Sequence, residues 1–347
     1  LHPVAHSFPT RRSSDLKKRF RVLMTESLGF KKGEDFSFWA VLLGFFFLYC
    51  SYYGCDQSQV QRELSSKNID DTNMSLFLNG VMRFFLALSL VVMGLCIGAA
   101  LLRDVTDPQN RTFLFAILSK PELQNQMAIH FILKYLPHGV IGIIVVSIFS
   151  AAMSSLDSAI NSLSATSMRD IYERFVNSDP NEATHLFWSK VMTIFWGIVC
   201  TVSAFLTPYF GKNVMVAINK VGSLTYGPIL ATFLLAILTR RANDKGTIIG
   251  ILTGVIGNMI IWQLTPISWL WWNVIGCIIT FIIGYITSFC FEIPNVEKLE
   301  GLVYCKGISK QFDYKKNWSV YYAVLVGFFI LFLVICSLIQ TIPSYMG

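Results

Sequence analysis

The residues with the clearest chemical potential lie between positions 147 and 175, where an apolar stretch becomes dense in serines and small residues. In a helix, residues four apart share one face, which groups these serines on one stripe: Ser150, Ser154, Ser158 and Ser162. Polar groups within a long apolar stretch need a reason, because burying them without a partner is costly. One interpretation is close helix packing, in which each hydroxyl bonds back to the carbonyl one turn earlier.

The other interpretation is a cation site. The adjacent hydroxyls of Ser154 and Ser155 can point oxygens at a dehydrated alkali cation, helped by a backbone carbonyl such as that of Ala151. A full sodium shell needs more oxygens than two hydroxyls supply, so a second, locally broken helix has to complete it. Asp157, one turn from Ser154, is a further candidate ligand; alternatively its carboxylate pairs with a neighbouring donor or is reached by water.

A second polar stretch, residues 47–67, follows an aromatic run and contains Gly54, at which a helix should weaken. Tyr52 lies just before this glycine, where a tyrosine can serve as an anchor at the membrane interface. Asp56 and Arg62 follow, and we expect them to form a structural ion pair at the rim of the membrane.

Polar residues also interrupt two other apolar runs. The charge of Arg83 is costly within its apolar run unless the side chain snorkels to the interface or faces a cavity. In a cavity, its guanidinium suits an anionic or hydroxyl-rich solute. Asn219 begins a run that contains Gly222, Gly227 and Pro228, which allow a kink and close packing.

Membrane helices must position these residues. The 347 residues are 54% hydrophobic and 14% charged, with a mean hydropathy of +0.54, which is too apolar for a water-soluble domain of this size. Stretches near the length of about 20 residues that a bilayer demands recur along the chain. They fall at residues 37–55, 76–102, 138–167, 186–208, 214–239, 246–264, 269–290 and 319–342. Because lipid offers no partner for backbone polar groups, each is expected to be a helix.

The loops indicate which side of the membrane each end faces. Loops 56–75, 168–185, 240–245 and 291–318 carry most of the loop lysines and arginines, which places them in the cytoplasm. The loop 103–137 is then external, and its segment Pro121–Leu136 predicts a short surface helix. The sequence Asn110-Arg111-Thr112 in this loop is a glycosylation sequon.

Other classes of protein are excluded. The net charge of +7 is concentrated near the N-terminus and forms no basic face with an aromatic platform, so nucleic-acid binding is not expected. The cysteines form no C-x-x-C pair and the histidines no H-E-x-x-H, so we expect neither an enzyme nor an organic cofactor. Residues 1–16 lack a signal-peptide core and resemble translated adapter sequence, and residues 17–36 form a polar lead-in loop.

The serine-rich stretch closely resembles the sodium-site helix of the sodium:solute symporter family, which includes glucose, proline, pantothenate, iodide and monocarboxylate carriers. Ser154 and Ser155 fall on the family's sodium ligands, and residues 168–175 resemble the cytoplasmic end of that helix. Asp157 departs from members that carry a small neutral residue at its position. The D-Q-x-x-V-Q-R sequence that starts at Asp56 resembles part of the family's sixth core helix.

The same resemblance implies roles on the solute pathway. Tyr52 takes the position of the inner-gate tyrosine that closes under the substrate. Arg83 matches a basic residue that lines the pathway in some relatives, and Asn219 takes the place of a substrate-contacting amide in the tenth core helix.

The resemblance covers residues 37–342 and implies an all-α membrane protein with the leucine-transporter-type fold, in which two inverted five-helix repeats enclose a midplane site. The spans correspond to the second repeat plus three accessory helices, so we expect this chain alone not to transport. The implied whole protein is a multi-pass symporter of the cell membrane, in which Na⁺ entry drives uptake of a small solute such as a sugar, carboxylate or vitamin by alternating access. A transporter-like membrane sensor of solute is the alternative.

Overall fold

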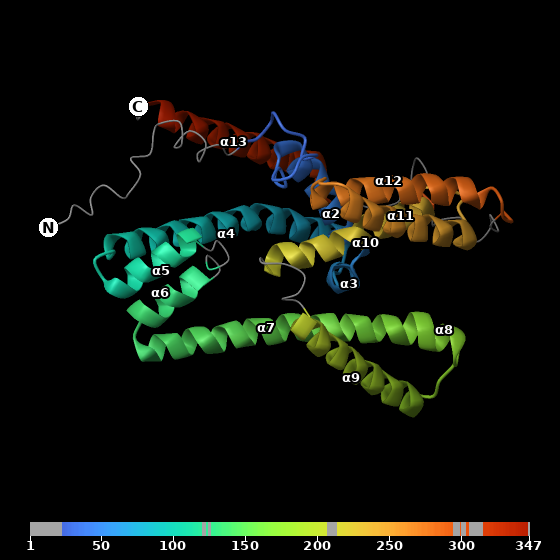
Figure 1. Ribbon diagram of the computed structural model, residues 1–347. Coiled ribbons are helices and arrows are strands. Elements are labelled where there is room, and N and C mark those ends of the chain that lie inside the picture. Colours follow the sequence, from blue (N-terminus) through green and yellow to red (C-terminus); the bar gives the residue numbers. More distant parts are fainter. Residues whose placement is uncertain are drawn as a thin grey trace. The chain divides into compact units, whose positions relative to one another are not determined.

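The chain folds into helices joined by loops (Figure 1). The computed structural model describes residues 23–119, 123, 126–206, 214–293, 299, 303, 304 and 315–345, and no strand occurs among them. Residues 1–16, set aside above, lie outside the described part, as does Pro121, the expected start of the short surface helix. Eight of the described helices are long and apolar enough to cross a membrane, which confirms the predicted all-α class with about eight spans.

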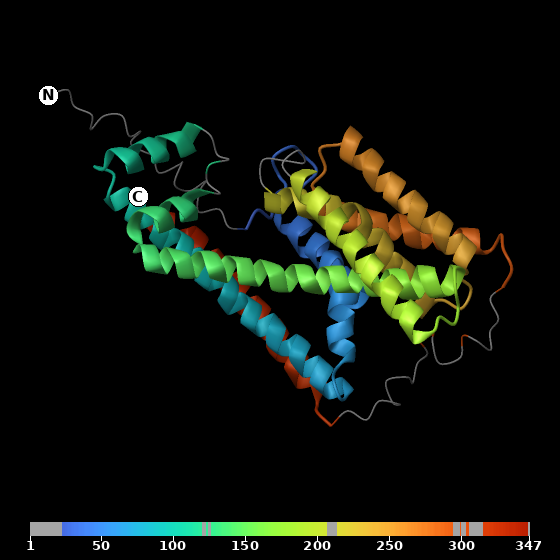
Figure 2. The same ribbon diagram turned by 90° about the horizontal axis from the view of Figure 1, so that it is seen from below.

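The membrane-length helices are α2 (Phe38–Cys55), α4 (Ile69–Arg103), α7 (His138–Thr166), α9 (Glu182–Leu206), α10 (Val214–Leu238), α11 (Asp244–Leu264), α12 (Trp269–Ser288) and α13 (Trp318–Tyr345). A π-helical turn, η3 (Ser167–Tyr172), continues α7 into α8 (Glu173–Phe175), and Figures 1 and 2 show them as one long rod. The shorter helices are α3 (Gln57–Leu64), α5 (Pro108–Ser119) and α6 (Met127–Tyr135). The loop 103–137, which the sequence predicts to be external, thus holds two short helices where the sequence predicts one.

The helices form two compact units, which are described separately below. The first contains α2, residues 66–78 at the start of α4, and the chain from Gly222 onward. The second contains residues 56–65, with α3, and residues 79–221, with the rest of α4 and α5 to α9. Both α4 and α10 therefore continue from one unit into the other.

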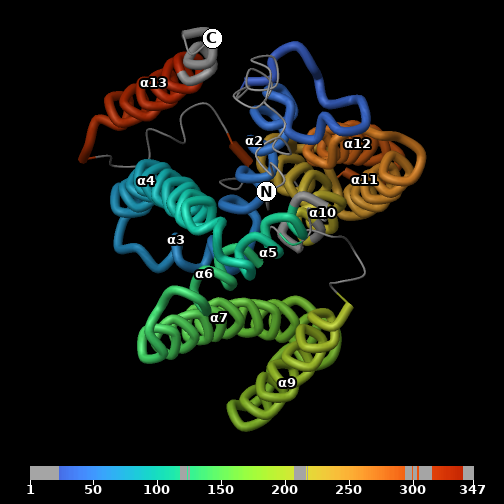
Figure 3. The backbone as a smooth tube through the Cα atoms, turned by 60° about the vertical axis from the view of Figure 1, so that its left-hand side comes forward, coloured from blue at the N-terminus to red at the C-terminus, as the bar shows by residue number. Residues whose placement is uncertain are grey.

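Small residues bring α11 and α12 together in the first unit (Figure 3). Gly246, Gly250 and Gly254 recur at every fourth position of α11 and face α12. A Cβ on Gly250 would lie 2.7 Å from the Cα of Gly284, so the two backbones are in contact there. This is the small-xxx-small packing that is typical of membrane helices. On another side of α12, Gly44 of α2 packs directly against Leu270.

The described part of the lead-in loop is bonded to the turn between α11 and α12. The hydroxyl of Ser268 donates to the carbonyl of Asp35 at 2.7 Å, and the indole of Trp271 donates to the carbonyl of Leu28 at 2.7 Å. The backbone N–H of Ser268 donates to the carbonyl of Gly29 at 2.9 Å, and Gly29 has a φ of +82° that favours glycine. The loop before α2 therefore has defined partners far away in the sequence.

At the other end of the first unit, Asp70 connects α4 to α13. Its buried carboxylate accepts a hydrogen bond from the backbone N–H of Lys315 at 2.7 Å and another from the indole of Trp318. Two turns along α4 and one turn along α13, the rings of Phe77 and Tyr321 meet edge to face, with their centroids 5.2 Å apart. The start of α13 is thereby fastened to the start of α4.

In the second unit α7 and α9 form a helical hairpin that polar residues hold near its closed end. The indole of Trp196 donates to the hydroxyl of Ser167 at 2.8 Å, and the hydroxyl of Ser164 donates to the carbonyl of Ser189 at 3.1 Å. Ser164 also accepts from Thr193 at 3.1 Å. The hydroxyls at the C-terminal end of the serine-rich helix therefore serve packing, as the first interpretation of that stretch proposes.

Candidate functional site

The serines of α7 separate into two groups by what their hydroxyls bond. Ser147, Ser158 and Ser162 each donate to the carbonyl four residues earlier, at 2.7, 3.1 and 2.8 Å. These bonds confirm the back-bonding interpretation for these three positions. Within the described part of the chain, the hydroxyls of Ser150, Ser154 and Ser155 make no such bond.

The predicted cation ligands lie together on an exposed part of α7. Ala151, Ser154, Ser155 and Asp157 are all exposed, and all belong to the second unit. The carboxylate of Asp157 has no hydrogen bond or ion pair with any described residue, so the alternative of a paired carboxylate finds no partner there. The described residues also contain no cluster of three or more His, Cys, Asp or Glu side chains that could hold a metal. The oxygens available to a cation are thus hydroxyls, carbonyls and one carboxylate, a set that suits a hard ion such as sodium.

The structure joins the two sequence stretches on which the resemblance rests. Arg62, on α3, donates from Nη2 to the hydroxyl of Ser158 on α7 at 3.2 Å. That hydroxyl in turn donates to the carbonyl of Ser154 at 3.1 Å. A continuous chain of hydrogen bonds therefore runs from a guanidinium on α3 to the backbone of the serine pair.

The expected ion pair between Asp56 and Arg62 is wrong. Asp56 is the N-cap of α3, and its Oδ1 accepts from the backbone N–H of Ser58 at 2.8 Å and from the Ser58 hydroxyl at 2.5 Å. This carboxylate satisfies orphan donors at the start of the helix, which is the usual task of an aspartate at that position. Arg62 instead bonds the hydroxyl of Ser158 on α7.

The three predicted pathway residues lie on separate helices. Tyr52 is half-buried on α2 in the first unit, and its ring meets that of Tyr53 edge to face at 5.2 Å. Arg83 is exposed on α4, and Asn219 is half-buried on α10; both belong to the second unit. Their predicted contacts with a solute stay predictions.

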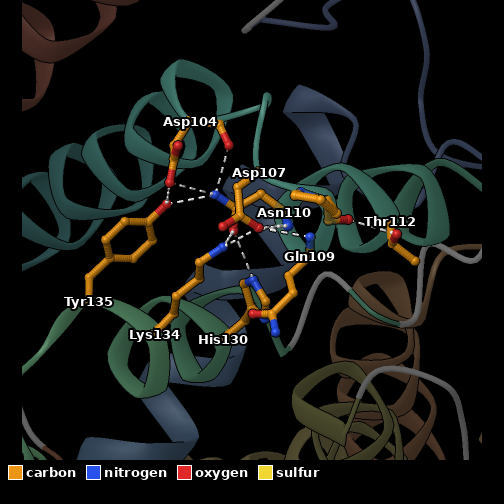
Figure 4. A network of polar contacts seen from close by, with 9 residues as sticks. Asp104, Asp107, Gln109, Asn110, Thr112, His130, Lys134 and Tyr135 are labelled. Carbon is orange, nitrogen blue, oxygen red and sulfur yellow. Dashed lines mark hydrogen bonds and ion pairs between the residues drawn. The ribbon is translucent and has the colours of Figure 1, made fainter.

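The loop 103–137 contains a polar network that the sequence analysis missed (Figure 4). Its centre is Asn110 of α5, which is completely buried. Its Nδ2 lies 2.9 Å from the carbonyl of Asp104 and 2.6 Å from the hydroxyl of Tyr135, while its Oδ1 accepts from Lys134 at 2.9 Å and from His130 Nε2 at 3.2 Å. The amide of Asn110 thereby connects the end of α4 with α5 and α6.

An ion pair and a histidine also belong to this network. Lys134 also forms an ion pair with Asp107 at 2.7 Å, and its hydrogen bond holds the pKa of Asp107 below the usual range of a carboxyl. Burial, followed by the nearby charge of Lys134, lowers the pKa of His130, whose ring stacks on Phe113 at 4.1 Å. Asp107 stands directly before Pro108, the first residue of α5, and this N-cap pattern was the available signal for a helix.

The network changes the meaning of the sequon. A glycan would have to be joined to Nδ2 of Asn110, the atom that is buried and engaged with Asp104 and Tyr135. Asn110 is therefore a structural residue of the folded loop, and the sequon does not present an accessible amide.

Comparisons with known proteins agree with these observations. The family model described as "Sodium:solute symporter family" matches residues 17–254, so the match includes the lead-in loop and ends within α11. The chain is 29% identical over 255 residues to the sodium/sialic acid symporter NanT of Aliivibrio fischeri, covering 73% of this chain and 48% of the relative. It is 31% identical over 219 residues to the sodium-coupled monocarboxylate transporter 1 of Mus musculus, covering 63% and 34%.

A solved structure shares the fold. It is the substrate-bound outward-open state of a Na⁺-coupled sialic acid symporter, with a TM-score of 0.57, 23% identity, and coverage of 75% of this chain and 51% of that one. The chain spans about half the length of the sialic acid symporters it matches. Because these relatives are transporters rather than enzymes, the expectation of a non-enzymatic, multi-pass membrane protein is confirmed.

Proposed function

The chain belongs to the sodium:solute symporter family, and from that premise we propose that the whole protein takes up a small solute by coupling it to Na⁺ entry. The observation that carries the proposal is the contrast within α7. The hydroxyls of Ser147, Ser158 and Ser162 bond carbonyls of the helix itself, whereas those of Ser154 and Ser155, like that of Ser150, bond no described residue. Uncommitted hydroxyls at the positions of the family's ion ligands support a site for sodium.

Each proposed ligand has a distinct part. Ser154 and Ser155 supply hydroxyl oxygens, and Ala151 supplies its carbonyl. Asp157 adds a carboxylate, which raises the affinity for a cation through charge as well as coordination. The remaining oxygens come from a broken helix of the other repeat, which this chain lacks on the proposed correspondence, so we infer that the chain alone does not transport.

Sodium supplies the driving force. One charge that moves inward through 100 mV releases about 2.3 kcal/mol, to which the concentration gradient of Na⁺ adds. In the proposed cycle of alternating access, Tyr52 closes the inner gate under the solute, and Arg83 and Asn219 contact it. An arginine on the pathway suits a carboxylate, a group that sialic acid and monocarboxylates share.

Uptake by the full-length protein in sodium-free proteoliposomes diluted into sodium buffer, so that the Na⁺ gradient points inward, tests this function. The probes are N-acetylneuraminate, lactate and biotin, each offered with a sodium gradient and with a potassium gradient. We expect saturable, sodium-dependent uptake of at least one probe. Binding without uptake in either gradient would instead favour the membrane sensor.

A pair of variants tests the ion site. Ser154→Ala and Ser155→Ala should each raise the sodium concentration for half-maximal uptake roughly tenfold, because each removes one oxygen ligand of the sodium ion. Ser147→Ala is the matched control, since its hydroxyl bonds the carbonyl of Ile143 within the same helix. An equal shift in all three variants, or none in any, would remove the serine pair from the sodium site.

A further inference from the structure

A proline interrupts the backbone hydrogen bonds of α10, and another helix supplies the missing donor. Pro228 lies inside α10 and has no N–H, so the carbonyl of Leu224, four residues earlier, loses its helical partner. Pro228 is fully buried, and Leu224 is almost so. A buried carbonyl without a partner is costly, so the carbonyl of Leu224 needs another donor.

Asn258 of α11 provides the missing donor. Its Nδ2 donates to the carbonyl of Leu224 at 3.0 Å and lies 3.4 Å from the carbonyl of Ser223. Asn258 is completely buried, although the rest of α11 is mainly apolar. A buried amide persists in such a place only when its hydrogen bonds repay the loss of water.

The facing surface of α12 is shaped to hold this contact. A Cβ on Gly276 would collide with the amide of Asn258 and come within 2.9 Å of the Pro228 ring, so only glycine leaves room for both. Asn273, also of α12, donates from Nδ2 to the hydroxyl of Ser223 at 3.2 Å. Two buried asparagines, one from each accessory helix, thus hold the same turn of α10.

This contact lies close to the boundary between the two compact units. α10 is one of two helices that continue from one compact unit into the other, and the boundary falls just before Gly222. The turn held by Asn258 and Asn273 begins at the next residue, Ser223. The part of α10 after the boundary is therefore tied to α11 and α12.

We propose that Asn258 is a positioning residue that clamps the proline break of α10, so that residues 223–228 keep a fixed geometry against α11 and α12. The clamp itself follows from the hydrogen bonds; its effect on transport rests on the proposed function.

Hydrogen exchange tests the clamp without any solute. In the full-length protein, Asn258→Leu removes the donor and should raise amide exchange in peptides that cover residues 222–229 about tenfold. Thr253→Val is the matched control on α11, because that hydroxyl bonds only carbonyls of its own helix, at 2.8 Å. Unchanged exchange in Asn258→Leu, or an equal rise in Thr253→Val, would overturn the clamp.

A second substitution distinguishes the clamp from general damage. Pro228→Ala restores an N–H that can bond the carbonyl of Leu224, so Asn258→Leu should change exchange less than twofold in that background. The double variant should also recover folding if Asn258→Leu alone folds poorly. A full effect of Asn258→Leu in the Pro228→Ala background, or no recovery, contradicts the proposal.

Transport kinetics test the positioning role. With the best probe found above, Asn258→Leu should lower the maximal uptake rate about tenfold and leave the sodium concentration for half-maximal uptake within twofold. Raised exchange with an unchanged uptake rate would show a merely structural contact and overturn the role. Failure of wild-type uptake refutes the proposed function instead, and the exchange experiment still decides the clamp.

Discussion

Replacing Asn110 tests whether the external loop depends on its buried amide. Asn110→Leu keeps the number and branching of the side-chain heavy atoms but removes every hydrogen bond of the side chain. Lys134 keeps its ion pair with Asp107, and Tyr135 keeps its 2.7 Å bond to Asp104. The ring N–H of His130 is left without a partner, and the carbonyl of Asp104 keeps only the backbone N–H of Asp107, at 3.3 Å.

The size of the effect follows from those two groups. The unpaired N–H of His130 costs about 1 to 3 kcal/mol and the bond lost at Asp104 about 0.5 to 1.5 kcal/mol, a sum of roughly 2 to 4 kcal/mol. Amide exchange in α5 and α6 should then rise by roughly 30-fold or more, up to the limit that the loop's own stability sets. Exchange in the α11–α12 pair, in the other unit, should not change.

Thr112→Val is the matched control. It destroys the same sequon, but its hydroxyl bonds only the carbonyl of Pro108, at 2.8 Å, within α5. Amide exchange in α5 and α6 of Thr112→Val should stay within about threefold of wild type. The electrophoretic mobility of this variant from a eukaryotic host should not differ from that of wild type. Equal loosening by Asn110→Leu and Thr112→Val, or a faster-migrating Thr112→Val protein, would refute the buried role of the amide.

Acidification should loosen the external loop. The pKa of His130 is lowered from 6.5 in the folded loop, by burial and by Lys134 against the weaker opposing charge of Asp107, so its contribution is complete above pH 6.5 and is lost as pH falls through the lowered value. Exchange in α6 should therefore increase below pH 6.5, and His130→Gln should flatten that dependence. Gly250→Ala should lower the melting temperature of the purified protein through overpacking of about 1 to 3 kcal/mol, whereas Gly98→Ala, which points into open space, should not. Arg62→Ala should raise exchange in α3 only two- to fivefold, because its exposed bond to α7 is worth less than about 1 kcal/mol; a larger rise would mean that this bond holds α3 in place.

The membrane helices could be predicted because the bilayer imposes their length and apolar composition on the sequence. The serine stretch was interpretable for a similar reason, since helical spacing alone brings each hydroxyl to the carbonyl one turn earlier. What spacing does not reveal is which serines make that bond. Ser158 and Ser154 share one stripe, yet only Ser158 bonds back, and it also accepts from Arg62 of a different helix.

Local signals explain two of the remaining differences. Asp56 is followed three residues later by Gln59, a spacing typical of a helix start, so capping could have been preferred to the ion pair. Asp107-Pro108 carries the same kind of signal for α5. By contrast, nothing near Pro228 in the sequence indicates Asn258 as its partner, because that contact depends on how three helices pack.

The bonds between the lead-in loop and the α11–α12 turn have a consequence for biosynthesis. Asp35 and its partner Ser268 are 233 residues apart, and Gly44 likewise packs against Leu270, which is synthesised much later. At ordinary ribosomal speeds, α2 therefore spends roughly 12 to 47 s in the membrane before its final neighbours have been made. During that interval Gly44 lacks the packing surface of Leu270, so a nascent chain stalled before α12 carries α2 without this final neighbour.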